Sequence, residues 1–277
     1  MGFEKKKLPP ASFQLVFHPE GDKEYRHFAG AAQAPFDAGA TAFSFVNAWW
    51  LADASLLAYW DAVPAVRCFG EAGLRAELIH SDGTQCYVAS TNSFTIVAFR
   101  GTEPDAIQDV VTNARAVLME WNASERVHGG FKEGLDKVWK KLAAALQALS
   151  TRPVWFSGHS LGAALATLAA DRVERERERQ GFGKVGGVYT FGSPLVGDRP
   201  FVDAFNHRFG DRSARFVNDQ DIVTRVPLPV LGYRHVNNEH FVGTNDPELV
   251  LSEGLIDHTP RRYAVLVWNA FVDAGRA

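Results

Sequence analysis

The sequence has little cysteine and no marked excess of either charge. Only two of its 277 residues are cysteines, Cys68 and Cys86. Their number and spacing exclude a multi-disulfide framework, a CxxC redox pair and a cysteine-based zinc site. We expect two ordinary thiols, and a single disulfide between them stays open. Lys and Arg number 29 against 32 Asp and Glu, a net charge of −3. The basic footprint of a nucleic-acid-binding protein is therefore missing.

Long hydrophobic runs and recognisable targeting signals are also lacking. Residues 153–170 carry no charged side chain over about the length of a membrane helix, but Gly158 and Gly162 interrupt them. We therefore expect no spanning helix. Near the N-terminus, the apolar segment 11–17 is short and contains Gln14, which does not make a convincing signal peptide. The default expectation is a cytoplasmic protein, with secretion left open for a trimmed chain.

The composition is that of an ordinary folded protein. Hydrophobic residues make up 46% and charged residues 22% of the sequence, close to the globular norm. No repeat period or linker-like stretch divides the chain. We interpret residues 1–277 as one α/β domain.

Hydrophobic periodicity predicts the elements of this domain. Helices are expected over residues 41–60, 107–118, 129–149, 160–179 and 262–272, and strands over 74–80, 84–89, 94–99, 154–157, 185–191, 214–217 and 240–242. The Asp82-Gly83 pair predicts a hairpin turn. The alternating charges of residues 171–180 are typical of a solvated helix end. Strand and helix alternate in the second half, which indicates a mainly parallel sheet.

The most informative motif is Gly158-His-Ser160-Leu-Gly162. About 0.1 such G-x-S-x-G motifs would arise by chance in this composition, so the motif alone is weak evidence. Here a hydrophobic strand precedes it and an alanine-rich helix follows it, which is the context of a nucleophile elbow. Small residues let the strand and helix approach closely while the turn exposes the serine hydroxyl. Ser160 is therefore the candidate nucleophile.

A serine nucleophile needs a base and a carboxylate that orients the base, in the chain order Ser, Asp, His. Asp219 and Asp221 both follow a predicted strand and qualify by position. Four histidines follow the serine: His207, His235, His240 and His258. The first precedes the acid and the third lies in a predicted strand, so His235 and His258 remain. His258 is favoured by chain order and by its place before the last helix.

These residues belong to a longer series of landmarks, and the chain resembles a class 3 lipase, the family typified by the secreted fungal triacylglycerol lipases. The landmarks lie, in order, at residues 96–104, 127–131, 158–162, 189–194, 221–223 and 257–258. The resemblance covers about residues 80–265. It implies an α/β-hydrolase fold with a mainly parallel central sheet flanked by helices.

The resemblance also implies roles for individual residues. Ser160 would be the nucleophile, Asp221 rather than Asp219 the acid, and His258 the base. The oxyanion hole would consist of the backbone N–H groups of Thr102 and Leu161. No metal or organic cofactor is expected.

The resemblance places a lid at residues 102–128. Asp109 stands there, but Val110 replaces the tryptophan that the family usually carries, and Asn113 stands where a second aspartate is common. This departure argues against interfacial activation of the family's usual kind. The apolar stripe Ile107, Val110, Val111 and Ala114 fits a mobile lid or a fixed surface helix.

We therefore expect a serine carboxylic-ester hydrolase, a triacylglycerol lipase acting on acylglycerols or other acyl esters at a lipid–water interface. A soluble-ester esterase of the feruloyl kind, a phospholipase A1 and a non-catalytic binding protein are the alternatives. Because signal and cysteines are lacking, the resemblance points to a bacterial or intracellular branch. The sequence indicates no nucleic-acid partner and no oligomeric state, and residues 1–75 carry no recognised motif.

Overall fold

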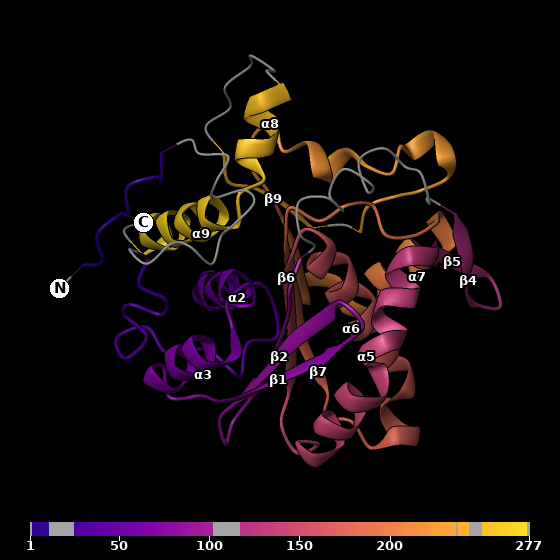
Figure 1. The fold of residues 1–277 in the computed structure, drawn as a ribbon, viewed down its shortest axis with the longest axis horizontal. Helices are drawn as coiled ribbons and strands as arrows, with labels where there is room; N and C mark the ends of the chain where they lie inside the picture. The colour runs from indigo at the N-terminus through magenta and orange to yellow at the C-terminus, as the bar shows by residue number, and fades with distance from the viewer. Residues whose placement is uncertain (1, 11–24, 102–116, 237, 244–250, 276–277) are drawn as a thin grey trace.

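The fold is a seven-stranded sheet between two layers of helices (Figure 1). The computed structural model describes residues 2–10, 25–101, 117–236, 238–243 and 251–275. The sheet has the order β1-β2-β3-β6-β7-β8-β9. Its strands are β1 (Arg75–Ser81), β2 (Thr84–Ser90), β3 (Thr95–Phe99), β6 (Val154–His159), β7 (Val185–Phe191), β8 (Ser213–Val217) and β9 (Glu239–Phe241). β1, β2 and β3 pair antiparallel, whereas every pairing from β3 to β9 is parallel. Parallel strands bring their carboxyl ends to one edge, where loops build a site.

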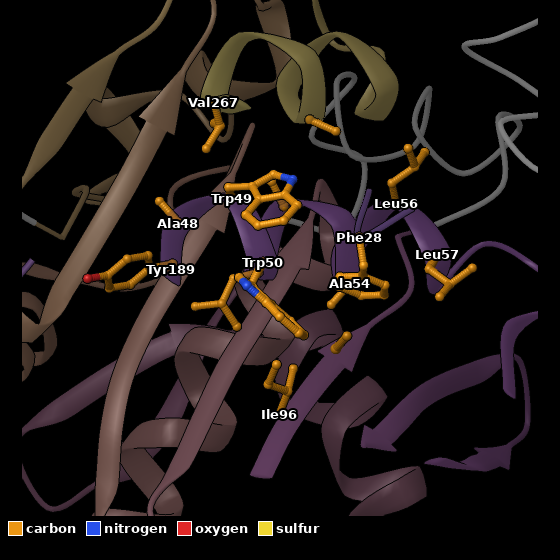
Figure 2. Close-up of a cluster of buried hydrophobic side chains, with 14 of the residues drawn as sticks. Phe28, Ala48, Trp49, Trp50, Ala54, Leu56, Leu57, Ile96, Tyr189 and Val267 are labelled. Carbon is orange, nitrogen blue, oxygen red and sulfur yellow. The ribbon is translucent and has the colours of Figure 1, made fainter. Parts of the chain in front are cut away.

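One face of the sheet is covered by segments from both ends of the chain. These are α2 (Phe45–Leu57), α3 (Ala62–Glu71) and α9 (Pro260–Ala274). Figure 2 shows Trp49 and Trp50 of α2 among Phe28, Ile96 and Val267. Residues 25–72 thus contribute much of this core although they carry no recognised motif.

The opposite face is covered by three helices from the middle of the chain, α5 (Gly129–Ala148), α6 (Leu161–Gln180) and α7 (Arg199–Phe209). A separate hairpin of β4 (Leu118–Asn122) and β5 (Glu125–His128) lies beside them (Figure 1). Short helix η2 (Gly210–Arg212) joins α7 to β8, η3 (Ile222–Arg225) and η4 (Pro229–Leu231) lie between β8 and β9, and α8 (Leu251–Asp257) precedes α9. No helix within the described ranges is long and apolar enough to cross a bilayer.

Most of the predicted elements are present with boundaries shifted by a few residues. The Asp82-Gly83 turn is confirmed, with positive φ at both residues, and Cys68 and Cys86 are free. The helix predicted over 107–118 is wrong at its end, because Leu118 begins strand β4. The remainder of that segment, residues 107–116, lies outside the described residues.

The elements that periodicity missed are α3, α7, α8 and the hairpin β4–β5. The two hairpin strands and α8 have only four to seven residues, too few for a clear period. In α3, Pro64 lies in the first turn, where the missing N–H is tolerated because first-turn amides lack helical partners.

The charge run at the end of α6 is only partly solvated, which corrects the expectation for residues 171–180. Asp171 is fully buried and accepts hydrogen bonds from Arg175 (2.6 Å) and from Trp121 on β4 (2.7 Å), and it also pairs with Arg208 on α7. The outer part of the run behaves as expected, with Arg177 and Glu174 paired one turn apart at 3.3 Å. A buried carboxylate is retained here because several donors satisfy it.

Candidate active site

Ser160 occupies the sharp turn between β6 and α6. Its backbone angles, φ 59° and ψ −130°, lie in a sparsely populated region for a residue with a side chain. A Cβ on Gly158 would overlap the carbonyl of Gly162, and a Cβ on Gly162 would overlap the carbonyl of Phe99. The two motif glycines are therefore sterically required, and the turn has the geometry of a nucleophile elbow.

An acid–base pair lies at the ends of other elements. Asp221 follows β8 and His258 precedes α9. The Nδ1 atom of His258 lies 2.9 Å and 3.0 Å from the two carboxylate oxygens of Asp221. Both side chains are almost completely buried. This arrangement fixes the imidazole with its Nδ1 toward the carboxylate and its Nε2 pointing elsewhere.

The alternative residues have other surroundings. His235 Nε2 lies 2.5 Å from the carbonyl oxygen of Thr224. His240 stacks on Phe43, with ring centroids 4.1 Å apart, and His207 lies within α7. The geometry therefore brings His258, and none of these three, to Asp221.

Asp219 is turned away from the pair. It adopts a positive φ of 34°, and a Cβ on Gly243 would overlap its carboxylate. It therefore lies against the segment after β9 rather than against His258.

Ser160 and the acid–base pair meet at the carboxyl ends of β6 and β7. The Ser160 amide donates to the carbonyl of Phe191, 3.0 Å away. The next residue, Gly192, faces the pair, since a Cβ there would lie 2.8 Å from Asp221 Oδ2 and 3.0 Å from His258 Nδ1. The buried Nε2 atom of His258 has no hydrogen-bond partner among the described residues. This nitrogen is available to accept a proton from a nearby hydroxyl.

Tyr263 on α9 supports the acid and was not identified from the sequence. Its hydroxyl donates to Asp221 Oδ2 (2.6 Å) and accepts from the Asn218 amide (3.0 Å). Burial, followed by the negative charge of Asp221, holds the pKa of Tyr263 well above its ordinary value. The hydroxyl therefore keeps its proton and remains a donor to the carboxylate.

His159 supports the base, a role that the motif around Ser160 does not indicate. Its Nε2 lies 2.6 Å from the backbone carbonyl oxygen of His258, and its Nδ1 lies 2.8 Å from the hydroxyl of Tyr59. Burial, and next the proximity of His258, lower the pKa of His159 well below 6.5. The ring is therefore neutral. Because a carbonyl can only accept, Nε2 carries the proton and Nδ1 accepts from Tyr59.

Of the two expected oxyanion donors, the structure describes Leu161 and not Thr102. Leu161 is the first residue of α6, so its amide belongs to the N-terminal N–H groups that have no partner within a helix. Thr102 and residues 102–116 of the expected lid lie outside the described residues. The rest of that segment contains β4 and β5.

Comparison with known proteins shows a similarity in the central part of the chain. The model for lipase (class 3) matches residues 96–231. The chain is 30% identical over 188 residues to secreted mono- and diacylglycerol lipase 1 of Fusarium solani, covering 62% of this chain and 52% of that protein. It is 34% identical over 191 residues to a chloroplastic phospholipase A(1) of Arabidopsis thaliana, covering 61% and 41%. The chain thus spans about half the length of the curated relatives it matches.

Solved structures show the same fold. The Rhizomucor miehei triacylglyceride lipase superposes with a TM-score of 0.55 at 25% identity, covering 65% of this chain and 70% of that one. A fungal lipase–inhibitor complex superposes with a TM-score of 0.60 at 21% identity, covering 74% and 83%. The fold is therefore that of the α/β-hydrolases.

The comparisons correct two expectations. The bacterial or intracellular branch is not supported, because the similar proteins are fungal lipases and a plant phospholipase. The expected cytoplasmic location is wrong, since several relatives are named as secreted lipases. That expectation depended on a missing signal pattern, and a missing pattern is not positive evidence for a compartment. Over residues 96–231, this chain is therefore similar to the class 3 lipases.

Proposed function

We propose that this protein is a serine carboxylic-ester hydrolase that cleaves acylglycerols. The observation that carries the proposal is the buried Asp221–His258 pair beside a strained serine elbow. A structural role for these residues would not require a serine in a strained conformation, nor a histidine whose Nε2 has no hydrogen-bond partner in the part of the chain that the structure describes.

In this mechanism Ser160 Oγ attacks the ester carbonyl carbon while His258 Nε2 takes the hydroxyl proton. The carbonyl oxygen becomes an oxyanion and is stabilised by the backbone amides of Leu161 and Thr102. His258 then protonates the leaving alcohol, which leaves an acyl-enzyme. Water, deprotonated by the same nitrogen, releases the acid and restores the serine. Asp221 holds the imidazole tautomer and stabilises its charged form throughout.

The substrate class follows the relatives. The names of the Fusarium and Malassezia proteins, which specify mono- and diacylglycerols, favour an acylglycerol substrate. Phospholipase A1 activity is the second candidate, favoured by the plant relative. Residues 1–277 would act as one catalytic domain, with 102–128 as its lid, and the secreted relatives favour an extracellular location.

The test is hydrolysis of tributyrin at concentrations carried through its solubility limit, together with covalent labelling by a fluorophosphonate. We expect the wild type to hydrolyse the ester and to be labelled, and Ser160→Ala to do neither. Ser213→Ala is the matched control, because Ser213 lies at the opposite, amino end of β8. Wild-type hydrolysis by Ser160→Ala would refute the assignment. A rate that rises when droplets form would indicate a mobile lid, and simple saturation would indicate an esterase.

A further inference from the structure

Large exposed hydrophobic side chains are concentrated on two neighbouring segments. Of the eight such side chains in the described ranges, five lie on or beside β4 and in the loop around η4. We call these five residues the apolar edge: Val117, Met119, Leu228, Val230 and Leu231. Val230 is 85% exposed, and the exposure of a branched apolar side chain to water is unfavourable.

The two segments form one continuous surface. A Cβ on Gly232 would lie 3.5 Å from Leu118 Cδ1, so the η4 loop contacts β4. Isolated bridges join Val127 of β5 to Gly197, and Gly197 to Arg234. Figure 1 shows the orange chain that follows β8 reaching the hairpin β4–β5. The apolar edge is therefore one patch and not two unrelated exposures.

Backbone hydrogen bonds hold the loop of this edge in place. The amide of Leu231 donates to the carbonyl of Leu228 (2.9 Å), and the amide of Gly232 donates to Pro229 (3.0 Å). The Arg234 side chain donates to the same Pro229 carbonyl at 3.0 Å. The apolar side chains are thus presented by a loop with defined hydrogen bonds, and less conformational entropy is lost when they insert into another phase.

The charges around the edge indicate what it contacts. Residues 226–233 contain no charged side chain, whereas Arg225 and Arg234 stand at the two ends. Arg126, on β5, has a side chain that is 62% exposed but pairs with Asp198 at 3.3 Å. The exposed Glu120 lies on β4, between Met119 and Trp121. An apolar loop with an arginine at each end matches a layer of acyl chains beneath anionic head groups.

The edge also lies close to the catalytic residues along the chain. Helix η3 begins directly after Asp221, and the η4 loop follows it. We propose that the apolar edge is a lipid-docking surface, which inserts into a lipid–water interface and holds the catalytic edge of the sheet against it. This inference rests on the proposed lipase function and identifies a docking element outside residues 102–116.

The test compares two valines of equal exposure. Val230→Asp places a charge in the apolar edge, whereas Val63→Asp places one on α3, at a residue that is 84% exposed. Binding to vesicles of phosphatidylcholine with phosphatidylglycerol is measured by sedimentation in the Ser160→Ala background, so that hydrolysis does not interfere. We expect Val230→Asp to weaken binding by about tenfold or more, and Val63→Asp to leave it unchanged. The Ser160→Ala parent should bind the mixed vesicles more strongly than vesicles of phosphatidylcholine alone.

Two results would overturn the inference. One is equal vesicle binding by the two aspartate variants. The other is a wild-type dimer, seen by light scattering, that Val230→Asp converts to a monomer, because the edge would then contact a second copy. Hydrolysis of the soluble ester p-nitrophenyl acetate separates this inference from the proposed function. If the wild type fails to hydrolyse that ester, the proposed function fails. Equal hydrolysis by the two valine variants made with Ser160 intact, together with unequal vesicle binding in the Ser160→Ala background, supports the docking surface.

Discussion

The two faces of the central sheet are packed with different kinds of side chain. The cluster under α2 and α9 buries Trp49, Trp50, Trp155 and Trp268 together with several tyrosines. The fully buried aromatic members of the cluster under α5, α6 and α7 are phenylalanines, among leucine, valine and alanine. Tryptophan and tyrosine carry a polar group that needs a partner when buried.

The irregular N-terminal chain supplies such partners for two of the four tryptophans, whereas the indole N–H groups of Trp49 and Trp155 have no hydrogen-bond partner among the described residues. The indole N–H of Trp50 donates to the Ala34 carbonyl (2.9 Å), and that of Trp268 donates to Glu4 (2.8 Å). Helix carbonyls on the other face are already engaged within their helices. The loop segments beside α2 and α9 thus provide acceptors for Trp50 and Trp268 that a purely helical layer would lack.

The candidate catalytic residues are divided between these faces. Ser160 joins β6 to α6 of the aliphatic face, whereas His258 directly precedes α9 of the aromatic face. The amide of Lys6 donates to Asn269 of α9 at 2.8 Å, so the N-terminal chain also holds that helix. The position of the base therefore depends on packing between the chain ends, and the position of the nucleophile depends on a local turn.

Asp221→Asn should have the largest effect, because it disrupts the charge-assisted hydrogen bond between the acid and His258. We expect kcat for ester hydrolysis to fall about 10⁴-fold, since an amide stabilises the wrong histidine tautomer. The measurement is steady-state hydrolysis of a soluble ester. Asp219→Asn is the matched control and should retain most activity. A fall of similar size in both variants would refute the assignment of the acid.

Trp49→Ala tests the aromatic face. Trp49 is fully buried, and its ring packs 4.7 Å from that of Trp268 on α9. We expect a loss of about 3–5 kcal/mol in the free energy of unfolding, measured by urea denaturation. Because α9 positions His258, kcat should also fall for the molecules that remain folded.

Leu142→Ala is the counterpart on the aliphatic face, where Leu142 of α5 is fully buried. A loss of about 2–5 kcal/mol is expected, with kcat of the folded fraction close to that of the wild type. Equal effects of both variants on kcat would contradict the division of roles between the faces.

The pH dependence of stability gives a smaller effect on the aliphatic side. Burial lowers the pKa of His128, which stacks on Phe131, to about 4, against an ordinary value of 6.5. Between these values the unfolded chain binds more protons than the folded chain, so stability falls as the pH drops from about 6.5 toward 4. We expect His128 to contribute a loss on the order of 1–3 kcal/mol over this window. Urea denaturation at pH 7.5 and pH 5 should show a smaller decrease in His128→Gln than in the wild type.

Tyr263→Phe should have the smallest effect, about tenfold or less on kcat with little change in KM. When the Tyr263 hydroxyl is removed, the Asp221 carboxylate loses a donor and attracts the protonated His258 more strongly. The acidic limb of the kcat/KM profile should therefore move to higher pH, a shift that lost packing alone would not produce. Tyr87→Phe is the control, because the Tyr87 hydroxyl donates to Trp60, away from the site. An unchanged profile in Tyr263→Phe would rule out its positioning role.

Local pattern was sufficient for much of the fold. The Asp82-Gly83 hairpin, the strand before Ser160 and the helix after it follow from turn chemistry and periodicity within about 20 residues. The network around Asp171 could not be predicted, because Trp121, Arg175 and Arg208 come from three separate elements. Its residues instead looked like a solvated helix end.

The candidate site divides in the same way. The spacing of Gly158, Ser160 and Gly162 indicates a nucleophile elbow, because steric overlap within one turn determines which residues fit. Residue order alone left two aspartates and two histidines open, and the family resemblance selected Asp221 and His258. The tertiary structure decided which carboxylate faces which imidazole, and that Tyr263 and His159 support them. Those contacts join residues 37 to 99 positions apart, and only packing of the sheet and both chain ends brings such distant residues together.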